Sequence, residues 1–144
     1  MKTKDAFDSM VKKLQDAIDR QEEKTYSDVV ISNYRNPTYF RKLKSADAKA
    51  DITGPCGDTI SLELVVKDLV IDDAGFSTDG CGASIACGNK LCSMIVGKTV
   101  EQAAHISSAQ LRTSLGGLPK DHEHCSVLAV NTLRACLDSY QRKK

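Results

Sequence analysis

Three cysteines in this chain stand where their thiols could together bind a metal ion or an iron–sulfur cluster. Cys56 lies in a Gly-Pro-Cys-Gly-Asp turn sequence, Cys81 lies in Asp-Gly-Cys-Gly between a predicted strand and a predicted helix, and Cys125 lies near the start of the last predicted helix. The positive end of a helix dipole lowers the pKa of a nearby thiol, so we expect thiolates at Cys81 and Cys125. Thiolates are preferred ligands of iron–sulfur clusters and of zinc.

Three thiolates complete neither a cluster nor a tetrahedral zinc site, so a fourth ligand must come from elsewhere. Two candidates stand beside the cysteines: Asp58 is two residues after Cys56, and His124 directly precedes Cys125. Neither holds iron–sulfur as firmly as a cysteine would, and a mixed site of that kind suits a cluster that must leave. From the residues alone, a labile cluster site and a catalytic zinc site look alike.

A thiol enzyme is a competing interpretation, with Cys125 as nucleophile, His124 as base and Asp58 as the orienting group. Adjacent residues on a helix are not expected to face one another, which makes His124 and Cys125 a poor catalytic pair. The sequence also shows no oxyanion-hole motif. The other cysteines are expected to be buried and structural, with a sulfur-relay or redox role as the alternative for the first of them: Cys87, Cys92 and Cys136.

The composition is that of an ordinary globular chain. The 144 residues fit one domain, and 41% of them are hydrophobic, which is enough for a core. Twenty basic residues face nineteen acidic ones, so no global basic field would draw in nucleic acid or an anionic membrane. No apolar run approaches the ~18 residues that a membrane span needs.

The N-terminal residues favour a cytoplasmic location. Residues 1–24 are heavily charged and include several acids, unlike a secretory signal or a transit peptide. In a reducing compartment, six cysteines point to metal binding or thiol chemistry rather than to disulfides. Residues 1–25 read as an amphipathic helical extension. Its apolar stripe is expected to pack on the core, with a partner surface or a dimer contact as the alternative: Phe7, Met10, Val11, Leu14, Ala17 and Ile18.

The remaining residues, 26–144, predict one α+β domain. A helix arriving from Tyr26 should end at Asn36-Pro37. Strands are expected over about 48–52, 59–66 and 70–78, with short connections that favour antiparallel pairing. Helical segments follow: one after residue 80, one with capping-box spacing at Thr99 and Gln102, one capped by Ser107 or Ser108, and one over about 121–142. Strands first and helices after predict a small antiparallel sheet of about three strands, with helices packed on one face.

Three motifs give this chain a specific resemblance over roughly residues 26–140. These are Gly54-Pro55-Cys56-Gly57-Asp58, the stretch from Phe76 to Ala86 around Cys81, and His124-Cys125-Ser126-Val127-Leu128-Ala129. An opening with Tyr26-Ser27 and Tyr34-Arg35-Asn36-Pro37 precedes them. In this order and at these distances, the motifs resemble those of the IscU-type iron–sulfur scaffold proteins, which are related to the N-terminal domain of NifU.

The resemblance implies a carrier rather than an enzyme. Cys56, Cys81 and Cys125 match the family's cluster cysteines, Asp58 matches the aspartate that tunes cluster lability, and His124 matches the histidine before the third cysteine. Sulfur would arrive as persulfide from a cysteine desulfurase, and iron and electrons from other partners. A labile 2Fe–2S cluster would form and pass to apo acceptor proteins, and zinc could occupy the cluster-free site. A homodimer is a further possibility.

The chain departs from the family's pattern at its chaperone-recognition stretch. That stretch, Leu-Pro-Pro-Val-Lys, is here Leu118-Pro119-Lys120-Asp121-His122, which leaves an Hsp70-type chaperone open as a partner. His122 and His105 carry no predicted role. The alternative function is that of the zinc-dependent SufU type, a sulfurtransferase that accepts persulfide sulfur. His124 and the absence of an obvious insertion favour the IscU type.

Overall fold

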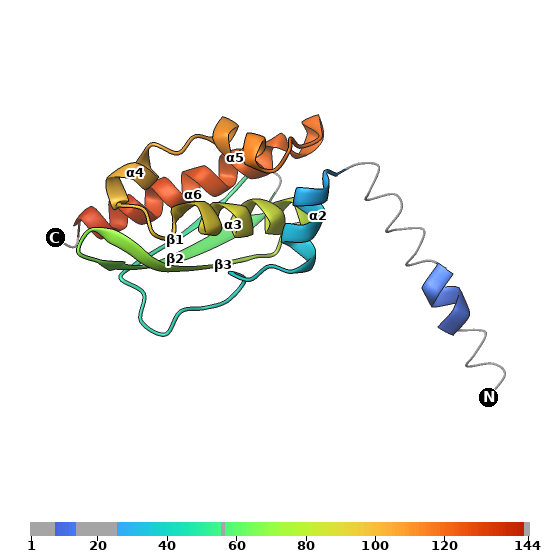
Figure 1. The fold of residues 1–144 in the computed structure, drawn as a ribbon, viewed down its shortest axis with the longest axis horizontal. Helices are drawn as coiled ribbons and strands as arrows, with labels where there is room; N and C mark the ends of the chain where they lie inside the picture. Colours follow the sequence, from blue (N-terminus) through green and yellow to red (C-terminus); the bar gives the residue numbers. More distant parts are fainter. Residues whose placement is uncertain (1–7, 14–25, 56, 143–144) are drawn as a thin grey trace.

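A three-stranded antiparallel sheet forms the platform of the domain. The structure is a computed structural model that describes residues 8–13, 26–55 and 57–142. Strands β1 (Ala48–Thr53), β2 (Thr59–Lys67) and β3 (Val70–Thr78) lie side by side in the order β1-β2-β3 (Figure 1). Both pairings are antiparallel, with Ile52 opposite Ile60 and Leu62 opposite Phe76. The predicted strands and their pairing are confirmed.

Alternation along β2 gives the sheet one apolar face. Its buried residues are Ile60, Leu62, Leu64 and Val66. Because successive side chains of a strand point to opposite faces, this pattern buries one face and leaves the other more polar. The β2–β3 connection is a tight turn in which Asp68 and Leu69 both take positive φ, as in the hairpin turns that match strand twist.

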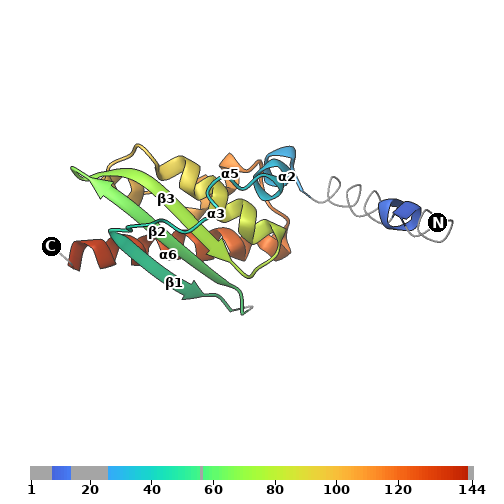
Figure 2. The same cartoon turned by 90° about the horizontal axis from the view of Figure 1, so that it is seen from below.

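Helices cover the apolar face of the sheet. Figure 2 shows the strands in front of them, which confirms the predicted α+β arrangement. Helix α6 packs on β1 and β2, α3 packs on β3, and the two helices contact each other. The helical elements are α2 (Asp28–Arg35), α3 (Gly82–Ile95), α4 (Val100–Ala104), α5 (Ser108–Ser114), the 3-10 turn η1 (Lys120–His122) and α6 (Glu123–Arg142). None of the described helices is both long and apolar enough to cross a membrane.

Local signals place the helix ends where the sequence predicts them. Helix α2 ends at Arg35 with Asn36 as its C-cap, directly before Pro37. Thr99 and Gln102 form a reciprocal capping box at α4, and Ser107 rather than Ser108 caps α5 in the same way. The last helix differs slightly, because Asp121 and His122 belong to η1 and α6 begins at Glu123.

Most of the predicted N-terminal helical extension, residues 1–25, lies outside the described residues. Residues 8–13 are helical. Met10 is 53% and Val11 46% exposed, so the expectation that the apolar stripe packs on the core is wrong for these two side chains. Helices α3 and α6 cover the apolar face of the sheet instead.

Gly88 allows α3 to approach β3 closely. A Cβ at this position would lie 2.5 Å from the ring of Phe76, which is itself buried. We predict that Gly88→Ala lowers the free energy of unfolding by about 1–3 kcal/mol through overpacking, although alanine favours a helix by ~1 kcal/mol. Urea denaturation measures this. Ser93→Ala, on the exposed side of the same helix, is the control, and a Gly88→Ala protein as stable as that control would contradict the packing.

Candidate metal centre

Cys81 occupies the junction between the sheet and α3. It is the N-cap residue of α3, three residues after β3 ends at Thr78. Side chains anchor the junction: Asp79 Oδ1 accepts a hydrogen bond from the Thr59 amide at 2.8 Å, and Thr78 Oγ1 accepts one from the Gly80 amide at 3.0 Å. Cys81 itself is exposed. The junction thus presents one thiol to solvent at a helix N-terminus, as predicted.

Cys125 approaches Cys81 from the start of α6. It is the third residue of that helix and is 1% exposed. Ser84, in the first turn of α3, donates a hydrogen bond from Oγ to Cys125 Sγ at 3.4 Å. Because α3 and α6 pack with their N-terminal turns together, cysteines that are far apart in the sequence meet at one point.

His122 completes a group of three ligating side chains that the sequence does not predict. One ligand atom each from Cys81, His122 and Cys125 lies within 4.8 Å of the other two. His122 Nδ1 is 3.9 Å from Cys81 Sγ. The spacing of His122, three residues before Cys125, could have indicated this contact, because residues three apart on a helix lie on the same side. His122 carries no predicted role, whereas His124, directly before Cys125, is a predicted ligand.

His124 also approaches the centre, through Cys125. Its Nε2 lies 3.7 Å from Cys125 Sγ, so the prediction that these adjacent residues do not face one another is wrong. The rings of His122 and His124 are stacked with centroids 6.5 Å apart, so two imidazoles lie next to each other beside the cysteine pair.

The turn that carries the first motif lies beside this centre. A Cβ at Gly80 would lie 3.1 Å from Asp58 Cγ, which places the Asp58 carboxyl next to the junction that holds Cys81. The Gly57 amide donates to the Gly54 carbonyl at 3.0 Å, and Gly57 takes a φ of +87° that favours glycine. Cys56 lies outside the described residues. Asp58 is not part of the three-atom group, so the predicted roles of Cys56 and Asp58 stay predictions.

A shared hydrogen bond separates the pKa values of the two thiols. The Cys125 thiol donates to the Cys81 sulfur and lowers the pKa of Cys81 to about 4; burial opposes this shift, and the Ser84 and Ala83 amides assist it. The same hydrogen bond, together with burial, raises the pKa of Cys125. The expectation of a thiolate at Cys125 is therefore wrong for the metal-free pair. At neutral pH the pair carries one proton, and its negative charge sits on Cys81.

The remaining cysteines are buried in the core, as predicted. Cys87, Cys92 and Cys136 are each 0% exposed. Burial raises the pKa of Cys87 to about 12 and raises that of Cys92 as well, so both are thiols at neutral pH. Cys136 Sγ donates a weak hydrogen bond to the Leu62 carbonyl at 3.6 Å, within the contact between α6 and β2.

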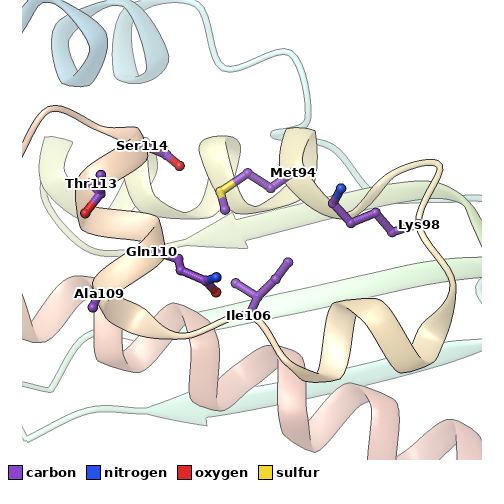
Figure 3. A pocket seen from close by; sticks show the side chains of 7 residues that line it. All are labelled: Met94, Lys98, Ile106, Ala109, Gln110, Thr113 and Ser114. Carbon is purple, nitrogen blue, oxygen red and sulfur yellow. The ribbon is translucent and has the colours of Figure 1, made fainter.

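A separate hollow between α3 and α5, about 480 Å³ in volume, lacks ligating groups. Figure 3 shows the side chains that line it: Met94, Lys98, Ile106, Ala109, Gln110, Thr113 and Ser114. None of these is a cysteine, a histidine or an acid. Met94 lies thirteen residues after Cys81, almost a full helix length away. The hollow therefore offers no second metal site.

Comparison with known sequences supports one family. A sequence model described as the NifU-like N terminal domain matches residues 25–144. The iron–sulfur cluster assembly scaffold protein IscU 1 of Archaeoglobus fulgidus is 40% identical over 119 residues, covering 82% of this chain and 78% of that protein. The IscU scaffold protein of Azotobacter vinelandii is 37% identical over 124 residues, covering 83% and 96%.

Solved structures share the fold. A NifU-like N-terminal protein from Brucella abortus superposes with a TM-score of 0.65 at 17% identity, covering 82% of this chain and 95% of that one. A protein described as a putative SUF-system scaffold, from Fervidobacterium islandicum, gives a TM-score of 0.64 at 21% identity, covering 78% and 96%. At these identities the likeness concerns the fold.

The protonation of the cysteine pair predicts selective alkylation of the metal-free protein. Between about pH 6 and pH 8, iodoacetamide should modify Cys81 at a nearly constant rate, whereas an ordinary thiol of pKa ~8.5 reacts roughly tenfold faster per pH unit. Mass spectrometry of peptides after chelation of metals measures this, with buried Cys87 as the unmodified internal control. Cys125→Ala removes the main donor, so the alkylation rate of Cys81 in that variant should rise with pH. If the alkylation rate of Cys81 in the wild type rises tenfold per pH unit, the shared hydrogen bond is refuted.

Proposed function

Because the chain belongs to the family of NifU-like N-terminal domains, we propose that it is a scaffold on which an iron–sulfur cluster is assembled and from which it is handed on. One observation carries the proposal: the N-terminal turns of α3 and α6 bring Cys81, Cys125 and imidazole nitrogen together, with Cys81 exposed. Soft thiolates next to imidazole suit iron–sulfur clusters and zinc. A partner can reach this centre from solvent, which a carrier requires.

The proposed ligand set combines the motifs with the geometry. Cys56, Cys81 and Cys125 supply thiolates, and Asp58 and His124 compete for the remaining position. The approach of His124 to Cys125 and of the Asp58 carboxyl to the Cys81 junction supports this set. Cys56 is included in this ligand set because of its Gly-Pro-Cys-Gly-Asp motif. A carboxylate or imidazole binds iron less firmly than a fourth cysteine, which fits a cluster that is meant to leave.

The cluster is the cargo of this protein, proposed as 2Fe–2S. A cysteine desulfurase would deliver sulfur as persulfide, and the exposed Cys81 thiolate is a suitable acceptor. Ferrous iron supplies part of the electrons that reduce sulfane sulfur to sulfide, and an electron donor supplies the rest. Apo iron–sulfur proteins would take the finished cluster. An Hsp70-type chaperone, a homodimer and a cytoplasmic location stay predictions from the sequence.

The zinc-dependent sulfurtransferase is the second candidate. The three-atom group of thiols and imidazole favours it, because zinc accepts that donor set. A thiol enzyme with Cys125 as nucleophile fits less well. The pKa of Cys125 is raised rather than lowered, so His124 faces a protonated thiol. We therefore propose a carrier rather than an enzyme.

Anaerobic reconstitution tests the scaffold proposal. The protein is incubated with ferrous iron, cysteine and a cysteine desulfurase, and iron, sulfide, zinc and absorbance are measured. We expect charge-transfer absorbance with matched iron and sulfide, lost in Cys56→Ser, Cys81→Ser and Cys125→Ser. Cys92→Ser and Cys136→Ser are matched controls, because both are buried away from the centre. Tight zinc without any cluster would favour the sulfurtransferase instead.

The carboxyl beside Cys81 should affect how long the cluster survives. If Asp58 promotes release, Asp58→Ala slows cluster loss several-fold in air, because a weak and exchangeable ligand no longer competes for iron. The decay of visible absorbance measures this. Asp79→Ala is the control, since Asp79 neighbours the same junction and accepts a hydrogen bond from the Thr59 amide. Equal or faster loss in Asp58→Ala would remove Asp58 from this role.

A further inference from the structure

His122 is placed to be a ligand in its own right. Its Nδ1 lies 3.9 Å from Cys81 Sγ. In a tetrahedral zinc site with Zn–S of about 2.3 Å and Zn–N of about 2.0 Å, a sulfur and a nitrogen ligand lie roughly 3.5 Å apart. A shift of a few tenths of an ångström would therefore bring both atoms into the coordination sphere of one cation. The third member of the group, Cys125, is within reach of both.

The surroundings of His122 resemble those of metal-binding histidines. Its second nitrogen, Nε2, faces the Asp121 carboxylate at 3.8 Å, and the Tyr26 ring lies 5.6 Å from the imidazole, centroid to centroid. A carboxylate beside the free nitrogen of a ligating histidine sets its tautomer and orientation. The His122 side chain is only 26% exposed and its amide donates to the Pro119 carbonyl at 2.9 Å, so it is held against the domain.

His124 lies differently. It approaches Cys125 but does not join the group of mutually close ligand atoms found among the described residues. One ligand atom of His122 lies within 4.8 Å of both sulfur atoms, and its Nδ1 approaches Cys81, whereas His124 makes its contact with Cys125 Sγ. His122 is therefore the imidazole placed to share one cation with both cysteines.

We propose that His122 Nδ1, together with Cys81 and Cys125, binds a thiophilic divalent cation such as zinc, and that Asp121 positions the imidazole. The inference rests on the proposed function, whose metal centre it extends to a residue outside the three motifs. Binding displaces the proton of the Cys125 thiol, since only thiolates ligate, and changes no oxidation state. The fourth position stays open to a ligand from the flanking residues or from solvent.

Zinc affinity, measured by competition with a chromophoric chelator on the full chain, tests the proposal. We expect His122→Ala to weaken zinc binding more than ~100-fold and Asp121→Asn about tenfold, the latter as a change beyond the ligand shell. His122→Lys should fail like His122→Ala, because an ammonium group has no lone pair to give. His105→Ala, an exposed histidine at the end of α4, should bind zinc like the wild type.

Cobalt substitution separates a lost ligand from a collapsed site. In His122→Ala the ligand-field bands should change while thiolate-to-cobalt charge transfer persists, because both cysteines still bind. Circular dichroism checks folding, and His122→Lys replaces the alanine variant if that one unfolds. Unchanged zinc affinity in His122→Ala and His122→Lys, with affinity lost in Cys81→Ser, would overturn the role of His122 and leave the centre standing. Unchanged affinity in Cys81→Ser as well would overturn the proposed centre itself.

Discussion

The contact between the first turns of α3 and α6 is the constraint on which the site depends. Ser84 and Cys125 are both buried there, and the hydrogen bond between them joins the two helices at their N-termini. The sheet makes this contact possible, because β2 buries a continuous apolar face on which both helices lie. Gly80 serves the same end, since a Cβ there would strike the Ser84 side chain at 2.5 Å. Packing in the core thus sets the separation of two thiols at the surface.

One consequence is an uneven division of charge. Two thiols that meet at helix N-termini would each be acidic alone, yet together they hold one proton, which stays on the buried Cys125. The exposed Cys81 therefore carries the negative charge, where a cation or an incoming sulfur donor can reach it. The two neighbouring imidazoles of His122 and His124 add nitrogen donors without adding further negative charge. The exposure of Cys81 fits the proposal that metal or sulfur comes from a partner protein.

Local chemistry made much of this predictable. The alternation of Ile60, Leu62 and Leu64, the capping pair of Thr99 and Gln102, and the glycines around Cys81 act within a few residues, so the sequence alone reveals them. The role of His122 could not be predicted from the sequence, because its approach to Cys81 depends on how η1 joins α6 and on how that segment packs near α3. The raised pKa of Cys125 could not be predicted either, because it follows from a hydrogen bond with Cys81, which is far away in the sequence.

Iron-edge X-ray absorption fine structure on the anaerobically reconstituted protein tests the central claim most directly. The account predicts a first shell dominated by sulfur at about 2.3 Å, as for metal–thiolate bonds, together with an iron–iron vector. Both signals should vanish when Cys81 and Cys125 are replaced by serine. A shell of oxygen and nitrogen alone, with no iron–iron vector, would contradict the claim that the meeting of α3 and α6 builds a cluster site.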